Sequence, residues 1–172
     1  FGAISSTDVQ AFTTTQANAL TAKQLGSLTT AVLGNFSTTQ VAALSTTQVQ
    51  GLTTTQLNAV GSDTLDAIDL TKLATTQFSG LNSTAFAALS DTQIGTLSAG
   101  QVGLLTSTQF GAISSTDVQA FSTTQANALT AKQLGSLTTT ALGNFSTTQV
   151  GALSTTQVQG LTTTQLNAVG SD

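Results

Sequence analysis

Residues 36–59 read FSTTQVAA-LSTTQVQG-LTTTQLNA, which is three successive copies of one eight-residue unit. The unit has the form h-[S/T]-T-T-Q-h-x-[A/G], where h is apolar, and its positions are numbered 1 to 8 below. Counting in eights from Ile4 gives a run of units that is interrupted once, by IDLTK at residues 68–72. All 20 complete units have an apolar residue at positions 1 and 6, and 14 have Gln at position 5. So regular a register excludes a merely low-complexity chain.

A second, longer period of 109 residues contains the first. Residues 1–63 and 110–172 differ at only four of 63 positions, which are Thr13/Ser122, Ala31/Thr140, Val32/Ala141 and Ala42/Gly151. We therefore divide the chain into a first super-repeat, residues 1–109, and a partial second one, residues 110–172. Residues 109 positions apart should have near-equivalent environments. Because Phe1 and Asp172 both fall inside repeat units, we expect the chain to be a segment of a longer array.

Neither a continuous helix nor a plain strand suits the unit. Eight residues turn an α-helix face by about 80°, so the apolar positions would spread around the helix axis. In a strand, positions 1 and 6 have opposite parity and would point to opposite faces. The chain must therefore turn within each unit.

The local spacing predicts how it turns. Ser or Thr followed three residues later by Gln is a capping box, and apolar residues flanking the box form a hydrophobic staple. In the unit that begins at Leu44, Ser45 is the predicted N-cap, Gln48 reaches back to its N–H, and Leu44 packs on Val49. Helices this short need neighbours for stability. The predicted fold is therefore an all-α solenoid of very short capped helices, one per repeat.

Two structural questions stay open at this level. The alternative fold is a β-solenoid, since Thr and Val favour strands and Thr or Gln ladders suit stacked coils. The insert at 68–72 is compatible with a kink, a bulge or one extra turn.

The composition argues against most kinds of chemistry. The chain has no His or Cys, so a Ser-His-Asp triad and the usual zinc ligands are excluded. Its three Lys residues are isolated and its net charge is −4, so nucleic-acid binding lacks an electrostatic basis. No apolar run approaches the roughly 20 residues of a membrane span. We expect no enzymatic activity, no cofactor, no nucleic-acid partner and no membrane span.

One acidic cluster is a candidate calcium site. Asp63, Asp66 and Asp69 are spaced by three and lie around the phase break. That spacing can place carboxylates on one helical face, and calcium prefers oxygen ligands. The structural alternative is that they serve caps and turns, where Asp is common, with Lys72 offsetting the charge of Asp69. We favour the structural interpretation.

The rows of Ser and Thr permit two further hypotheses. Regular Thr arrays are a feature of ice-binding solenoids, but here Thr occupies consecutive positions 2 to 4, which suits a cap and first turn. The same hydroxyls are potential carriers of O-linked sugars in a secreted protein.

Units such as LSTTQVQG-LTTTQLNA and FSTTQVGA-LSTTQVQG resemble the long L-[ST]-T-x-Q-V-x-A-L repeats of large proteobacterial surface proteins. Those proteins are often labelled as haem utilisation or adhesion proteins. The resemblance covers nearly the whole chain except IDLTK, at the level of the repeat. It implies a secreted or surface-attached fibrous array. The haem label finds no support in the residues, because His, Met, Cys and Tyr, the usual axial ligands, are absent.

These observations predict a structural protein of an extracellular bacterial filament, sheath or surface fibre. Its partners would be copies of itself, since an open, non-closing contact generates filaments. The alternative is the stalk or ligand-binding repeat region of a large adhesin. The residues expected to form the core and carry assembly are Phe12, Leu20, Leu28, Phe36, Leu44, Val49, Leu52, Gln16, Gln24, Gln40, Gln48 and Gln56. Val49→Asp should collapse the local stack.

Overall fold

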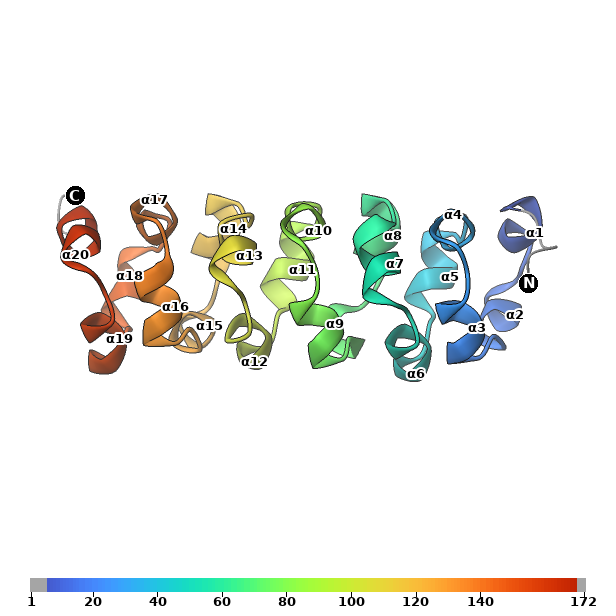
Figure 1. Ribbon diagram of the computed structural model, residues 1–172, viewed down its shortest axis with the longest axis horizontal. Helices are drawn as coiled ribbons and strands as arrows, with labels where there is room; N and C mark the ends of the chain where they lie inside the picture. The colour runs from blue at the N-terminus through green and yellow to red at the C-terminus, as the bar shows by residue number, and fades with distance from the viewer. Residues whose placement is uncertain (1–5, 170–172) are drawn as a thin grey trace. The chain divides into compact units, whose positions relative to one another are not determined.

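The computed structural model describes residues 6–169, and across them the chain is an all-α solenoid of short helices without a strand (Figure 1). The β-solenoid alternative is therefore wrong. The chain divides by its contacts into two compact units, Phe1–Ser90 and Asp91–Asp172. These two units follow from contacts between residues, whereas the two super-repeats follow from sequence identity, so their boundaries differ.

Unit 1 has ten short α-helices and one 3₁₀ helix among its described residues. They are α1 (Ser6–Gln10), α2 (Thr14–Asn18), α3 (Ala22–Gly26), α4 (Thr30–Leu33), α5 (Thr38–Ala42), α6 (Thr46–Gln50), α7 (Thr54–Ala59), α8 (Ser62–Asp66), η1 (Leu70–Lys72), α9 (Thr75–Ser79) and α10 (Ser83–Ala87). Each α-helix corresponds to one repeat unit, and η1 belongs to the five-residue insert.

Unit 2 continues with ten helices among its described residues. They are α11 (Asp91–Thr96), α12 (Ala99–Val102), α13 (Ser107–Phe110), α14 (Ser115–Ala120), α15 (Thr123–Asn127), α16 (Ala131–Ser136), α17 (Thr139–Gly143), α18 (Thr147–Gly151), α19 (Thr155–Gln159) and α20 (Thr163–Val169). The one-helix-per-repeat prediction is thus confirmed in both units.

The predicted capping geometry is confirmed as well. Ser45 has an extended backbone, its side chain accepts from the Gln48 N–H, and the Ser45 N–H donates to Gln48 Oε1 at 2.9 Å. Position 2 of the unit is thus the N-cap and position 5 is N3. Because the N-cap residue is extended, the chain changes direction there, and each cap starts a new helix at an angle to the last one.

Helices three places apart in the chain pack on one another in each unit. The contacts in unit 1 include α1 with α4, α2 with α5 and α3 with α6, and those in unit 2 include α12 with α15, α16 with α19 and α17 with α20 (Figure 1). One coil of the solenoid therefore takes three helices. The first residues of α2 and α5, Thr14 and Thr38, are 24 positions apart, so a coil is three repeat units.

The core is formed by the position 6 side chains. They are buried in 17 of the 20 units, from Val9 to Leu142. Most position 1 residues are buried too, Leu44 and Leu52 among them. Because each helix turns one apolar stripe inward, the stacked coils share a thin continuous core, which short helices require for stability.

Small residues let some coils approach closely. A Cβ atom built on Gly26 would collide with the carbonyl oxygen of Gly51, and one built on Gly51 would lie 2.6 Å from Ala22 Cβ. The equivalent residues of unit 2, Gly135 and Gly160, make the same approach. At these points α3 packs on α6, and α16 on α19, backbone against backbone.

Candidate assembly surface

The Gln residue at position 5 connects one coil to the coil before it. Gln40 Oε1 accepts from the Ser37 N–H at 2.7 Å, which completes its own helix cap. Its Nε2 donates to the carbonyl oxygens of Val9, at 3.2 Å, and Phe12. Val9 lies in the last turn of α1, where carbonyls lack partners within their own helix, and Phe12 lies in the turn that follows α1. One amide therefore serves the start of one helix and the end of another.

The same arrangement recurs, with a spacing of 28 positions except across the insert, where Gln77 donates to Leu52, 25 positions earlier. Gln48 Nε2 donates to the carbonyl oxygen of Leu20, 28 positions earlier, at 2.8 Å, and Gln56 Nε2 donates to Leu25 and Leu28. In unit 2, Gln157 Nε2 reaches Leu129 at 2.7 Å. We call this set the glutamine ladder; its members are Gln40, Gln48, Gln56, Gln77, Gln125, Gln133, Gln149, Gln157 and Gln165.

Gln suits this position because its amide has both an acceptor and a donor. The ladder needs an acceptor for the cap N–H and a donor for the carbonyls of the previous coil, and an amide carries both. Glu would supply only acceptors when ionised. At Ala74, which has no hydroxyl, the Gln half of the cap persists, since the Ala74 N–H donates to Gln77 Oε1 at 2.8 Å.

The five-residue insert forms the short helix η1. Ile68 and Leu70 are buried, and η1 packs on α6. Lys72 Nζ donates to the carbonyl oxygen of Leu44, 28 positions earlier, at 2.8 Å. This spacing equals that of the ladder, so Lys72 takes the place of a Gln amide. Of the three possibilities left open by the sequence, the insert is one extra turn, of 3₁₀ type.

In one repeat that lacks Gln, a side chain of the previous coil accepts the hydrogen bond from the N-cap N–H. Position 5 of the unit that begins at Leu81 is Ala85, so Asn82 lacks a Gln to accept from its N–H. Asn58 Oδ1, in the coil before, accepts from that N–H at 2.9 Å. Asn58 Nδ2 meanwhile donates to the carbonyl oxygen of Gly80 at 2.9 Å. Asn58 thus makes both contacts that a ladder Gln makes, but here the earlier coil supplies the amide and the later coil supplies the backbone groups.

The three acidic residues proposed for calcium have separate structural roles. Asp66 Oδ1 accepts from the Ser90 N–H at 2.9 Å, and Asp69 caps η1 by accepting from the Thr71 N–H at 3.0 Å. Asp63 lies in the first turn of α8. Within residues 6–169 no three acidic side chains are grouped so as to hold a metal ion. The geometry thus agrees with the capping interpretation.

Asp69 also has a perturbed acidity. The Thr71 hydroxyl donates to its carboxylate at 2.6 Å, and this bond lowers the pKa of Asp69, while burial acts in the opposite direction. The Thr71 N–H and the Lys72 ammonium, 3.9 Å away, lower the pKa further. The ion pair is exposed, so its own contribution to stability is small.

The residues predicted for core and assembly fall into two groups. The buried group comprises Phe36, Leu44, Val49, Leu52, Gln40, Gln48 and Gln56. The other group, in the first described coil, comprises Phe12, Leu20, Leu28 and Gln24, which are half-buried, and Gln16, which is exposed. Lys72, Asn58 and Asp66 were missed as contacts between coils, because their role appears only once the number of residues per coil is known.

The repeat-level resemblance has independent support. The family model of the ALTTAQ repeat matches residues 131–163. The match concerns the repeat alone, so the haem and adhesion labels and the proteobacterial source stay implications of the resemblance. No curated protein and no solved structure matches the chain. Between residues 6 and 169 no helix has the length and apolar character that a bilayer crossing requires.

Proposed function

We propose that this repeat protein is a structural component of an extracellular bacterial filament, sheath or surface fibre, which forms by self-association. The observation that carries the proposal is the glutamine ladder. In both units this one kind of contact recurs between coils, with Gln donors on one side and carbonyl acceptors on the other. Such a contact does not close on itself, and repeating it generates open assemblies.

The weak charge of the chain supports the same proposal. Only 6% of its residues are charged, and the net charge is −4, so copies repel one another little. The Ser and Thr hydroxyls keep the surface polar without charge. The extracellular or cell-surface location rests on the resemblance of the repeat. The absence of His and Cys from the sequence supports a non-catalytic role.

Electron microscopy of the purified protein tests the proposal. Negatively stained samples and sedimentation velocity, followed over increasing protein concentration, should show fibres or long oligomers. Assembly through apolar and neutral polar groups should change little between low and high NaCl, because charge screening acts on few groups. A protein that stays monomeric over the whole concentration range would contradict self-assembly and favour the alternative, an adhesin stalk or ligand-binding region.

A further inference from the structure

The repeat unit that contains α14 has a carboxylate where the glutamine ladder has an amide. Its sequence is ISSTDVQA, residues 113–120, so Asp117 stands at position 5. Asp117 is 5% exposed, which is as deep as the ladder residue Gln125 of the next unit, at 7%. An ionised carboxylate accepts hydrogen bonds and donates none, so Asp117 offers no donor to a backbone carbonyl.

The shorter side chain of Asp117 also changes the helix cap. In the next unit the Ser122 N–H donates to Gln125 Oε1 at 2.8 Å, which completes the capping box. At α14 the carboxylate meets the N-cap hydroxyl instead. Ser114 Oγ donates to Asp117 Oδ2 at 2.5 Å and accepts from the Asp117 N–H at 3.1 Å. The start of α14 therefore has half of a capping box, whereas the start of α15 has both halves.

The second carboxylate oxygen of Asp117 is buried without a hydrogen bond. Within residues 6–169, Oδ1 is enclosed by protein atoms and has no partner. Residues 73–131 contain neither Lys nor Arg, so these repeats provide no cation to offset its charge. A buried polar atom without a partner costs free energy of folding, and a charged one costs more. Holding α14 in its folded place therefore has a cost that α15, with Gln125, does not have.

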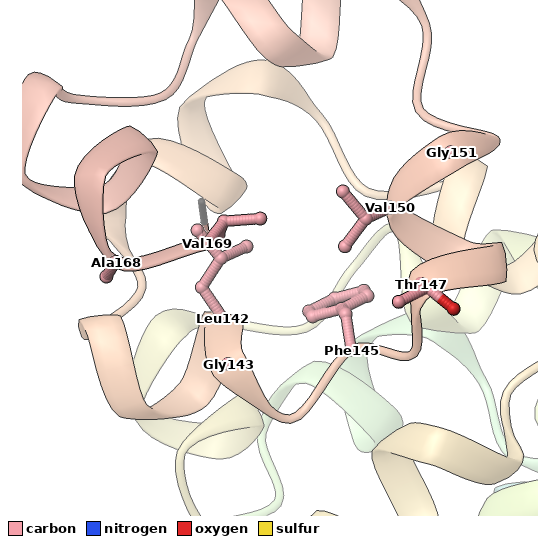
Figure 2. Close-up of a pocket in the computed structure, with 8 residues that line it drawn as sticks. All are labelled: Leu142, Gly143, Phe145, Thr147, Val150, Gly151, Ala168 and Val169. Carbon is pink, nitrogen blue, oxygen red and sulfur yellow. The ribbon is translucent and has the colours of Figure 1, made fainter. Parts of the chain in front are cut away.

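The absence of Gln does not by itself create this cost. Helix α17 has Ala141 at position 5, and the Ala141 N–H donates to the Thr138 hydroxyl at 3.1 Å. The side chain of Ala141 has no polar atom that needs a partner. The apolar side chains Leu142, Phe145 and Val150 lie around a hollow of 310 Å³ beside this helix (Figure 2). The buried carboxylate therefore distinguishes α14 both from α15 and from α17.

We infer that α14 is an opening point of the solenoid, a helix that separates from its neighbours before the rest of unit 2 unfolds. Separation lets water solvate Asp117 Oδ1, and it breaks the packing of α14 on α11 and exposes Val118. Because each solenoid repeat contacts only its neighbours, one helix can open while the other coils stay folded. The inference concerns a single chain, so it does not depend on the proposed self-association.

The opening point would let an array of these repeats yield at one place without losing its fold. Asp8 has the same position in the first super-repeat, in an identical unit ISSTDVQA. Under a stretching or bending load, the helix with the buried carboxylate gives way first, and the glutamine-bonded coils beside it remain intact. It closes again when the load is removed, because its apolar side chains return to the core.

Hydrogen–deuterium exchange, followed residue by residue by NMR, tests this inference. The amides of Val118 and Phe121 report on α14, and those of Ala126 and Leu129 are their counterparts in the next unit. All four donate to backbone carbonyls at 3.0 to 3.3 Å, so bond length does not separate them. After correction for intrinsic rates, we expect the α14 pair to exchange at least about tenfold faster.

Matched substitutions identify the cause of the difference. Asp117→Gln restores an acceptor for the Ser114 N–H and an amide donor, so the Val118 amide should slow to the rate of Ala126. Gln125→Asp puts the same carboxylate into α15 and should accelerate the Ala126 amide by about tenfold. Gln119→Asp adds a charge at an exposed position of α14 itself, and should change the Val118 rate by less than about twofold.

Four results would overturn the inference. They are equal protection of α14 and α15 in the parent, one common exchange rate throughout unit 2, an Asp117→Gln protein whose Val118 amide is no slower, and a Gln119→Asp protein that opens as readily as Gln125→Asp. Circular dichroism shows whether each variant is folded. Asp117→Gln remains decisive if Gln125→Asp does not fold, because it adds contacts and removes a buried charge.

Discussion

At the scale of the residue, the decisive property is that a Gln amide both accepts and donates. Its oxygen completes the helix cap in place, and its NH₂ group binds carbonyls at a helix end of the previous coil. Gln48, for example, accepts from Ser45 and donates to the carbonyl of Leu20. Because Gln48 is buried, both ends of its amide need hydrogen-bond partners, since a buried polar group without one costs free energy of folding.

Gln48→Glu should therefore destabilise the fold strongly. Glu keeps the cap acceptor, but it places a carboxylate against the carbonyls of Ala17 and Leu20, so we expect the free energy of unfolding to fall by about 2–4 kcal/mol at neutral pH. Urea unfolding followed by circular dichroism measures the change. Gln16→Glu is the control, because Gln16 accepts the equivalent cap bond at 2.8 Å but has no carbonyl partner among the described residues. This substitution should cost less than about 0.5 kcal/mol. Equal losses would show that the bonds between coils contribute nothing.

Asp69 should make part of the stability of the fold depend on pH. Its folded-state pKa is lowered, chiefly by the Thr71 hydroxyl, so the ionised form stabilises the folded state. That contribution is fully present above the ordinary Asp range, near about pH 4, and is lost as the pH falls through the folded-state value. Unfolding experiments from neutral to acidic pH should show this loss in the parent, and a smaller one in Asp69→Asn. An identical acid dependence in the two proteins would contradict the role of Asp69.

At the scale of the element, the helices are defined by their ends. Each has about one turn, so helix propensity alone cannot hold it. The N-cap hydroxyl and Gln oxygen satisfy N–H groups at the start, and the next coil's Gln satisfies carbonyls at the end. Close packing then depends on small residues where helices meet backbone to backbone, as at Gly26 and Gly51.

Gly51→Ala tests that packing. The added methyl would lie 2.6 Å from Ala22 Cβ and 2.7 Å from its Cα, so the backbone of α3 or α6 must shift. We expect a loss of about 1–3 kcal/mol in the free energy of unfolding, as for other overpacked sites. Gly151→Ala is the control, because nothing lies within 4 Å of its added methyl and Ala42 occupies the equivalent position. It should be neutral or stabilise by up to about 1 kcal/mol. A Gly51→Ala protein as stable as the parent would contradict the close approach.

At the scale of the whole molecule, identical repeat units differ according to whether a further coil covers them. The units that begin at Leu44 and Leu153 both read LSTTQVQG, yet Val49 is buried and Val158 is exposed. Solenoid repeats contact their neighbours only, so the environment of a unit depends on its place in the array.

The same substitution at these two positions should therefore have unequal effects. Val49→Asp places a carboxylate in the core and should cost about 3–5 kcal/mol, whereas Val158→Asp should cost less than about 1 kcal/mol in the isolated chain. Thermal and urea unfolding at low protein concentration would measure both. If Val49→Asp melts and assembles like the parent, the assignment of Val49 to the core is wrong.

Sequence alone was sufficient for the cap, the short helix and the apolar register. Those features depend on contacts between residues three to five positions apart, such as Ser45 with Gln48, and the repeat specifies such contacts directly. The choice of a helical over a β-solenoid followed from the same capping box, and the structure settled it.

Only the tertiary structure determined the three-helix coil and everything that depends on it. The number of helices per coil is set by the angle at which each extended N-cap redirects the chain, and no residue pattern within one unit encodes that angle. Without it, the partners of Gln48, 28 to 31 positions earlier, could not be assigned. Nor could Lys72 be recognised as a substitute for Gln, or Asn58 as the cap of Asn82. The eight-residue unit thus determined each helix, while packing between coils decided which helices meet.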